Sequence, residues 1–288
     1  MSSVRIVVLT SVAMVAFASN SILCRIALKD TAIDAASFTT IRLISGAAAL
    51  WVVARIRHGP LVGGRWLSAF ALFIYAAGFS YAYVSLTAAT GALLLFGAVQ
   101  ATMVGYGLRS GERLRKLQFI GFFLALGGLV SLLLPGLSAP PLFASLLMLG
   151  AGAAWGAYSL YGKGTGAPTM ATAGNFLRAV PMAAVLSVLM YKGTSLDVTG
   201  FWYAICSGVL ASGIGYAIWY TALPELKATT AATVQLSVPL IAAFGGIAFL
   251  GEAITLRLAL ASVAILGGIA LVILDHREFF CCGSRGGK

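Results

Sequence analysis

Two arginines stand inside long apolar stretches of the sequence, where a charged side chain is costly. Arg42 and Arg178 each lie several residues from the nearest polar boundary, and an arginine at the centre of a membrane-spanning helix costs about 2.5–3.5 kcal/mol or more. A guanidinium group in such a place either binds a carboxylate through its planar fork or donates to the carbonyls of a neighbouring helix. The second interpretation is favoured, because a single solute cannot lie beside both arginines at once, but the sequence leaves both open.

Neutral polar and aromatic side chains also occur within apolar stretches, at spacings that place them on one helix face. Asn20 and Ser21 share a face with Phe17, and Tyr158 shares one with Trp155, because residues three and four apart are neighbours on a helix. Such side chains either hold a bound solute or pack between helices. Together with the two arginines, the candidate solute-binding residues are Asn20, Ser21, Tyr81, Gln100, Trp155, Tyr158, Tyr216, Trp219, Gln235 and Ser237.

Gln100 and Gln235 are the strongest candidate pair, because an amide that faced lipid would leave its donors unsatisfied at a cost of several kcal/mol. Both side chains are therefore expected to point inward. Interhelical polar bonds worth ~0.6 kcal/mol are common, so binding of a solute and joining of helices are equally supported. Tyr81 and Tyr216 are candidate gate residues near opposite ends of a central cavity.

Other chemistries find little support in the sequence. The four cysteines form no CxxC pair, so neither a metal site nor a disulfide framework is predicted. The chain has no GxxxxGK[ST] loop, which excludes direct use of ATP. Every Asp, Glu and His falls outside the centre of an apolar stretch, so no titrating proton relay is predicted. No cofactor is expected.

The composition places these residues in a membrane. Hydrophobic residues make up 60% of the chain and charged residues 9%, whereas a soluble domain carries about 25% charged residues. This excludes a cytosolic enzyme and a receptor with a single anchor. Ten apolar stretches, each long enough to cross a hydrocarbon core of about 30 Å, predict an all-α polytopic membrane protein. They cover residues 4–28, 35–56, 66–86, 90–108, 114–134, 142–163, 169–191, 200–222, 227–250 and 256–274.

The basic residues predict the orientation. If the N-terminus lies inside, the inner segments hold thirteen Lys and Arg residues and the outer segments three; short loops rich in these residues stay cytoplasmic. Both termini are therefore predicted to be cytoplasmic in the bacterial inner membrane, with residues 277–288 as a short tail. The net charge of +11 reflects this bias and an attraction to anionic membrane lipid, so nucleic acid is not an expected partner.

The two halves of the chain resemble each other. Residues 111–134 align with 251–274, with Gly-Glu and Leu-Gly-Gly at the same spacing, and matches continue upstream at offsets of 135 to 138 residues. Residues 1–137 and 138–276 are therefore predicted five-helix repeats, and because five is odd, the second is inverted. Inverted repeats are typical of secondary transporters, whose halves rock about a central site; a duplicated bundle without transport is the alternative. Residues expected to allow bending or close helix approach are Gly78, Pro181, Gly213, Gly215 and Pro239.

These features resemble the drug/metabolite transporter superfamily, in its EamA branch. The likeness rests on the five-plus-five layout, the paired Gly-Glu turns, the Leu-Gly-Gly marks and Arg42 near the start of the second stretch. It covers essentially the whole chain, which is most similar to the YddG-type amino-acid exporters of that branch. The resemblance implies efflux through a central cavity built from the first four helices of each half, with the fifth and tenth helices peripheral.

The expected function is export of a small-molecule substrate, chiefly aromatic and neutral amino acids, by alternating access. A monomer that works by facilitated or exchange-type transport is predicted. Efflux of drugs or other metabolites is the main alternative. A membrane-embedded transferase would need a nucleophile and a base near an interface, and a passive channel would usually need a polar ring from several subunits; the sequence gives no sign of either.

Overall fold

The computed structural model describes residues 3–56, 63–109, 116–134, 136, 139–162, 168–222, 226 and 234–275. All regular elements within these ranges are helices, as expected for apolar segments whose backbone groups find no partner in lipid and must bond within the segment. The longer elements are α1 (Ser3–Asp30), α2 (Ala35–Ile56), α3 (Trp66–Tyr83), α4 (Ala88–Arg109), α5 (Lys116–Leu133), α6 (Leu142–Gly162), α7 (Pro168–Leu189), α11 (Ser237–Leu250) and α12 (Leu256–Asp275).

Eight of the ten predicted spans are long and apolar enough to cross a membrane in the described part of the chain. Two shorter apolar helices, Ser237–Leu250 and Leu256–Leu271, correspond to the ninth and tenth. Residues 227–233, with which the ninth predicted span begins, and the predicted tail 277–288 lie outside the described residues. The chain is therefore a multi-pass membrane protein, as predicted.

The eighth span contains an irregularity that the hydrophobic pattern did not predict. Its residues Val198–Ala222 form α8 (Val198–Cys206), a π-helical segment η2 (Ser207–Ile214) and α9 (Gly215–Ala222). We call η2 the π segment. π-helical turns are rare and occur frequently at functional sites. The π segment packs against α2 so closely that a Cβ atom on Gly208 would overlap the Ser45 hydroxyl and the Arg42 carbonyl.

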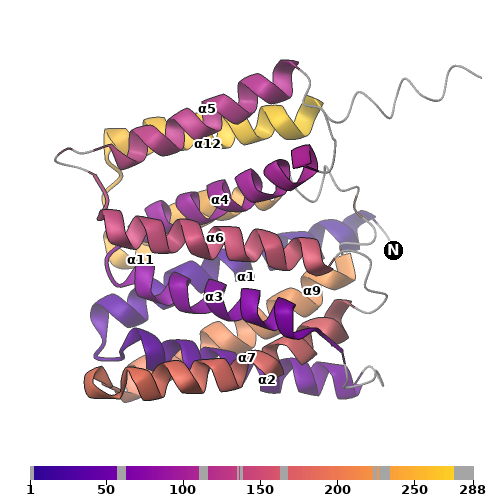
Figure 1. Ribbon diagram of the computed structural model, residues 1–288, viewed down its shortest axis with the longest axis vertical. Helices are drawn as coiled ribbons and strands as arrows, with labels where there is room; N and C mark the ends of the chain where they lie inside the picture. Colours follow the sequence, from indigo (N-terminus) through magenta and orange to yellow (C-terminus); the bar gives the residue numbers. More distant parts are fainter. Residues whose placement is uncertain are drawn as a thin grey trace, which may run out of the picture.

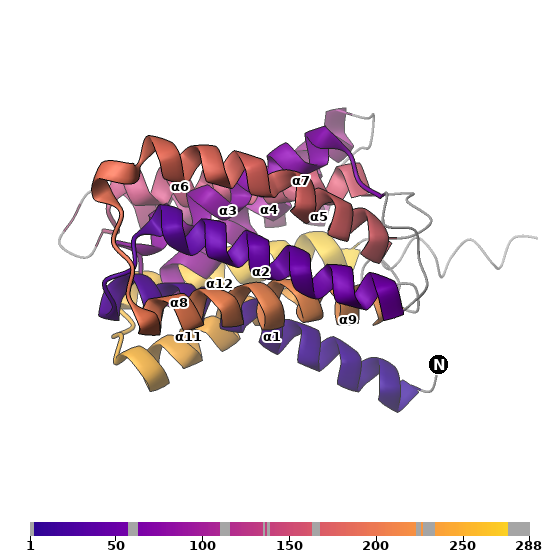
Figure 2. The same cartoon turned by 90° about the horizontal axis from the view of Figure 1, so that it is seen from below.

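The helices lie side by side, with α5 and α12 paired at one edge of the bundle and α2 and α7 at the opposite edge (Figure 1). The view in Figure 2 shows α3, α6 and α7 on one side, with α1 and α11 on the other. Connections 31–34, 84–87, 190–197 and 251–255 gather at one end of the bundle (Figure 1). We call this the Asp34 end. The opposite end, where α2 stops and α3 starts, is the Gly63 end.

Asp34 ties two connections together at the end named after it. Its Oδ1 accepts hydrogen bonds from the Ala36 and Ser37 amides, which caps α2, while its Oδ2 accepts one from the Ser195 amide at 3.0 Å. Desolvation by burial opposes ionisation, but the hydrogen bonds from Ser37, Ser195 and Ala36 outweigh it and hold the pKa of Asp34 below its ordinary value. Asp34 is therefore a structural anchor that stays ionised at neutral pH.

Small residues set the distances between helices. The missing Cβ atom of Gly152 on α6 would lie 2.5 Å from the Leu95 carbonyl of α4, and that of Gly156 would lie 2.9 Å from Thr102 Cβ. The Gly152-xxx-Gly156 spacing thus marks a close helix contact.

The residues predicted to bend or to allow close approach fall into two groups. A Cβ atom on Gly78 would lie 3.1 Å from the Leu147 carbonyl, and Cβ atoms on Gly213 and Gly215 would lie 2.8 and 2.9 Å from Ala49 Cβ and Ala16 Cβ. These glycines therefore serve close approach. Pro181 lies inside α7, whereas Pro239 lies in the first turn of α11, where its missing N–H costs nothing.

Candidate functional site

A buried group of polar and aromatic side chains lies where helices from the first and second parts of the chain meet. Its members come from α1, α2, α3, α6, the π segment and α9. We call it the central cluster; it comprises Phe17, Asn20, Arg42, Tyr75, Phe79, Trp155, Ser207 and Tyr216.

Asn20 is the polar junction of the central cluster. Its Nδ2 donates to the Tyr75 hydroxyl at 3.2 Å, and its Oδ1 accepts from the Ser207 hydroxyl at 2.7 Å. Asn20 is 6% exposed, so these bonds satisfy an amide that would otherwise be costly to bury. The junction joins α1 to α3 and to the π segment. The structure therefore brings the predicted residue Asn20 together with Tyr75 and with Ser207, a residue that the sequence analysis did not single out.

Aromatic rings continue the cluster in one connected row. The centroids of Tyr75 and Trp155 are 4.8 Å apart, and Trp155 stacks on Tyr216 at 5.2 Å with 21° between the ring planes. Phe17 then contacts Tyr216 at 5.5 Å and Trp219 at 6.0 Å. Each such pair contributes about 0.5–1.5 kcal/mol beyond burial. Trp155 stays partly exposed, so the row offers one apolar face that is not fully covered.

Arg42 lies beside this row, with its guanidinium over two rings. The Arg42 Cζ atom is 5.3 Å from the Tyr75 centroid and 4.9 Å from that of Phe79. Arg42 is 1% exposed, and its Nε and Nη1 atoms have no hydrogen-bond partner. Rings over a desolvated cation attract it but accept none of its N–H groups in the usual way. Arg42 Nε and Nη1 are therefore buried donors without an acceptor.

Arg178, the residue that aligns with Arg42 in the sequence, has a different environment. Its Nη1 donates to the Gly63 and Gly174 carbonyls, and its Cζ lies 5.9 Å from the Trp66 ring. It thereby fastens the segment before α3 to α7 at the Gly63 end. Arg178 therefore donates to backbone carbonyls, which is the second of the two roles considered for a buried arginine in the sequence analysis.

Tyr158 belongs to a second polar group near the same end. Its hydroxyl donates to Thr172 Oγ1 at 3.3 Å and accepts from Asn175 Nδ2 at 3.4 Å. Asn175 Oδ1 in turn accepts from the Arg65 amide at 2.8 Å. Because Tyr158 also stacks on Trp155 at 5.3 Å, this group connects the central cluster to the Gly63 end.

The remaining predicted residues are scattered. Trp219 is 6% exposed and lies in the row of rings through its contact with Phe17, whereas Ser21 is 2% exposed and follows Asn20 on α1. Tyr81 and Gln235 are partly buried, and among the described residues no hydrogen bond or ring contact links either to the central cluster. The Ser237 hydroxyl donates to the Val234 carbonyl at 2.6 Å, which satisfies it locally.

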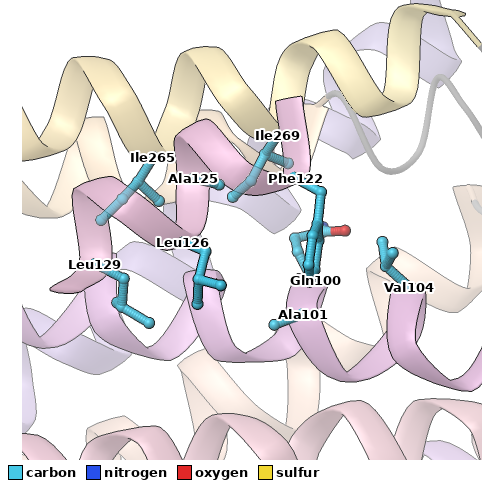
Figure 3. Close-up of a pocket in the computed structure, with 10 residues that line it drawn as sticks. Gln100, Ala101, Val104, Phe122, Ala125, Leu126, Leu129, Ile265 and Ile269 are labelled. Atoms are coloured by element: carbon cyan, nitrogen blue, oxygen red, sulfur yellow. The ribbon is translucent and has the colours of Figure 1, made fainter. Parts of the chain in front are cut away.

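Gln100 lies in a separate pocket at the side of the bundle. The pocket is a cleft lined by α4, α5 and α12, and its volume of about 450 Å³ includes space open to the surroundings (Figure 3). Apart from Gln100 its lining is apolar, with Phe122, Leu126 and Ile265 among the contributors. The structure does not bring Gln100 together with Gln235 or the central cluster, because the rotation of α4 turns this side chain toward the α5–α12 pair.

An ion pair that the sequence analysis missed closes the Asp34 end. Arg25 Nε lies 3.1 Å from Glu252 Oε1, with side-chain exposures of 12% and 8%. Arg25 Nη1 also donates to the Tyr83 and Val84 carbonyls, and Glu252 Oε2 accepts from the Ala88 amide at 2.8 Å. The repeated Gly-Glu pair at Gly251 and Glu252 was the feature of the sequence that could have indicated this contact. Gly251 ends α11 in the left-handed conformation at φ 62°, and Glu252 then points toward α1 and α4.

Comparison with known proteins is consistent with this architecture. The chain is 57% identical over 271 residues to the uncharacterized protein PA1977 of Pseudomonas aeruginosa, covering 93% of this chain and 94% of that protein. It is 34% identical over 161 residues to the threonine/homoserine exporter RhtA of Salmonella typhimurium, covering 53% of each. A solved crystal structure shares the fold with a TM-score of 0.66 at 18% identity, over 93% of this chain and 98% of the other.

A profile of the EamA-like transporter family matches residues 142–274, from the start of α6 almost to the end of α12. The members of this family are transporters rather than enzymes. The multi-pass helical fold agrees with that assignment, and so does the resemblance found in the sequence. Through residues 142–274, the chain is thus matched to the EamA-like transporter family.

Proposed function

We propose that this transporter exports small metabolites, with neutral and aromatic amino acids as the principal substrates, across the bacterial inner membrane. The observation that carries the proposal is the central cluster, which combines a cation, an amide, hydroxyls and stacked rings at the meeting point of six elements. An amino acid needs a partner for each of its charged groups and a surface for its side chain. The partial likeness to an exporter of threonine and homoserine points to the same substrate class.

We further propose that residues 1–137 and 138–276 are inverted repeats that move by alternating access. The pairing of helices supports this arrangement, since α2 packs on α7, α4 on α11 and α5 on α12. Each of these pairs joins one helix to its expected counterpart in the other half. Similarly, α3 packs on α6 while the span 198–222 packs on α1, which is the contact that a two-fold relation predicts.

In this proposal the Arg25–Glu252 bridge holds the Asp34 end of the transporter closed. It joins α1 and the start of α4 to the connection between α11 and α12, so it spans the two halves. Opening of the central cluster toward the Asp34 end requires this bridge to break. With both termini cytoplasmic, the Asp34 end faces the periplasm, and release of an exported solute follows bridge opening.

Counterflow in proteoliposomes tests the proposed function. We expect saturable exchange of radiolabelled phenylalanine or threonine against the unlabelled amino acid, unaffected by an imposed proton gradient in the absence of a membrane potential. Trp155→Ala removes the ring that contacts both Tyr75 and Tyr216, and we expect it to lower exchange at least tenfold. Phe143→Ala on the same helix, at a position 75% exposed, is the matched control. Exchange that is absent for every amino acid, or equal in both variants, contradicts the proposal.

Efflux of an apolar aromatic compound is the second candidate function, because the Trp155–Tyr216 stack at 5.2 Å suits a planar ring. The same vesicles distinguish the two candidates. Exchange of a planar uncharged aromatic dye that amino acids do not inhibit would favour drug efflux.

A further inference from the structure

We infer that Arg42 receives the carboxylate of the transported solute, which restricts the substrates to compounds with a free carboxylate. This assignment rests on the proposed transport function. Its starting point is that Arg42 is 1% exposed while two of its nitrogens, Nε and Nη1, are buried without a hydrogen-bond partner. A buried charged donor left unsatisfied is among the more costly features of a folded protein, so its presence calls for a ligand that is absent from the chain itself.

The acidic side chains that the structure describes are engaged elsewhere. Asp34 caps α2 and binds the Ser195 amide, Asp197 caps α8 through the Gly200 amide, and Glu252 is paired with Arg25. Asp30 is exposed at the end of α1. None of these four carboxylates is paired with Arg42. The anion that suits its planar fork is a carboxylate, which accepts two parallel N–H groups.

The aligned arginine shows what a structural arginine looks like in this fold. Arg178 Nη1 donates to two backbone carbonyls, Gly63 and Gly174, and so needs no further acceptor there. Arg42 makes no such contact through Nε or Nη1. Arg42 and Arg178 thus occupy matching positions in the two halves but have different partners. Because only Arg42 lacks acceptors, a solute needs to bind only one of the two arginines.

Groups suited to the rest of an amino acid lie next to Arg42. The Tyr75 ring that Arg42 covers is 4.8 Å from Trp155, and the Tyr75 hydroxyl is bonded to Asn20. An ammonium group beside a bound carboxylate can be held by the oxygens of Asn20, Tyr75 and Ser207 or by the face of Trp155. The rings of Trp155 and Tyr216 then cover the side chain.

The backbone beside Arg42 provides a way for the site to open. The π segment lies directly on the α2 turn that carries Arg42, since a Cβ atom on Gly208 would overlap the Arg42 carbonyl. Ser207, the first residue of the π segment, is bonded to Asn20 at 2.7 Å. Because π-helical turns depart from the preferred helical hydrogen-bonding pattern, a local change in this segment can separate it from α2 and expose the guanidinium group.

The experiment compares amino acids with analogues that lack the carboxylate, in wild-type proteoliposomes and without any substitution. Phenylalaninamide and threoninamide keep the ammonium group and side chain but not the charge on the carboxyl group. Counterflow of radiolabelled phenylalanine or threonine is measured with the acid or the amide as competitor. We expect each amide to compete at least tenfold more weakly than its acid. Equal competition by acid and amide overturns the assignment while leaving the proposed transport function intact.

Substitutions of Arg42 then test whether this residue causes the preference for the acid over the amide. Arg42→Gln is expected to reduce the difference between acid and amide to less than threefold, and Arg42→Lys to weaken acid binding at least tenfold, because an ammonium group has no planar fork. Arg178→Lys is the matched control. The folded fraction of this variant is expected to keep the wild-type preference for the acid over the amide.

Three outcomes decide between the proposals. If Arg42→Lys transports as the wild type does and with the same preference, the assignment is wrong. If the Arg42 variants fail to fold, the wild-type comparison of acid and amide decides alone. If wild-type vesicles exchange neither acids nor amides, the proposed function fails and the assignment falls with it.

Discussion

The Arg25–Glu252 bridge shows how one pair of residues joins distant parts of this chain. The two residues are 227 positions apart, and their carboxylate and guanidinium are also bonded to the Ala88 amide and the Tyr83 and Val84 carbonyls. Arg25 Nε and Nη1 and both carboxylate oxygens of Glu252 therefore have hydrogen-bond partners. A partly buried ion pair stabilises a fold only when such additional hydrogen bonds accompany it.

We predict that Glu252→Gln lowers the thermal stability of the transporter in detergent. The substitution keeps the shape and one hydrogen bond but removes the charge, and we expect a loss of about 1.5–3 kcal/mol, the range for hydrogen bonds to charged groups. Arg25→Gln in the same background should cost much less than it does in the wild type, since its partner is already gone. The measurement is a double-mutant cycle of unfolding free energies; strictly additive losses would show that the bridge contributes nothing.

At the scale of elements, the helices of the bundle approach one another where side chains are missing. Gly152 and Gly156 let α6 contact α4, and Gly208 lets the π segment contact α2. Within lipid there is no hydrophobic force between helices, so close van der Waals packing carries much of their association. The π segment adds a second property to its contact, because it lies next to both Asn20 and Arg42.

We predict opposite effects for two neighbouring glycines of α6. A Cβ atom at Gly152 would lie 2.5 Å from the Leu95 carbonyl, which is backbone and cannot move away, whereas Gly150 has nothing within 4 Å. Gly152→Ala should therefore destabilise the transporter by about 1–3 kcal/mol, the usual cost of overpacking. Gly150→Ala should be neutral or stabilising by about 0.5–1 kcal/mol, because alanine favours the helix. Thermal unfolding in one detergent compares the two; equal melting temperatures would mean that α4 and α6 are less tightly packed than described.

At the scale of the whole molecule, the surface carries two signs of a membrane environment. Large apolar side chains are exposed on many helices, among them Phe143 at 75%, Phe244 at 72% and Val263 at 74%. Lipid rather than water is the solvent that suits them. The second sign is the exposure of basic residues such as Arg55 and Arg109 at the Gly63 end, where anionic lipid headgroups would attract them.

The charge bias predicts which end faces the cytoplasm. A green fluorescent protein fused after Lys288 should fluoresce, and alkaline phosphatase at the same position should be inactive, because the terminus stays inside. Lys192→Cys, at an exposed position of the Asp34 end, should react with a membrane-impermeant maleimide in intact cells when the native cysteines are replaced. An active phosphatase fusion, or a Lys192→Cys variant that reacts only after lysis, would reverse the predicted orientation.

The sequence by itself determined the helical class, the number of apolar segments and most helix boundaries. Predicted spans 35–56 and 142–163 coincide with α2 (Ala35–Ile56) and α6 (Leu142–Gly162) within one residue. This follows because each membrane-crossing segment must satisfy its own backbone and shield it with apolar side chains, both of which are properties of a contiguous stretch. The same patterns singled out Asn20, Arg42, Trp155 and Tyr216, since a polar or ring-bearing residue inside such a stretch is visible without any partner.

Only the tertiary structure decided what those residues meet. It separated Arg42, with two unpartnered nitrogens, from Arg178, bonded to carbonyls, and it placed Gln100 in the lateral pocket between α4 and the α5–α12 pair. It also revealed the π segment and the Arg25–Glu252 bridge. These features depend on the rotation of each helix about its axis and on contacts across more than a hundred positions of sequence. Hydrophobic periodicity carries little of that information when lipid and protein interior are equally apolar.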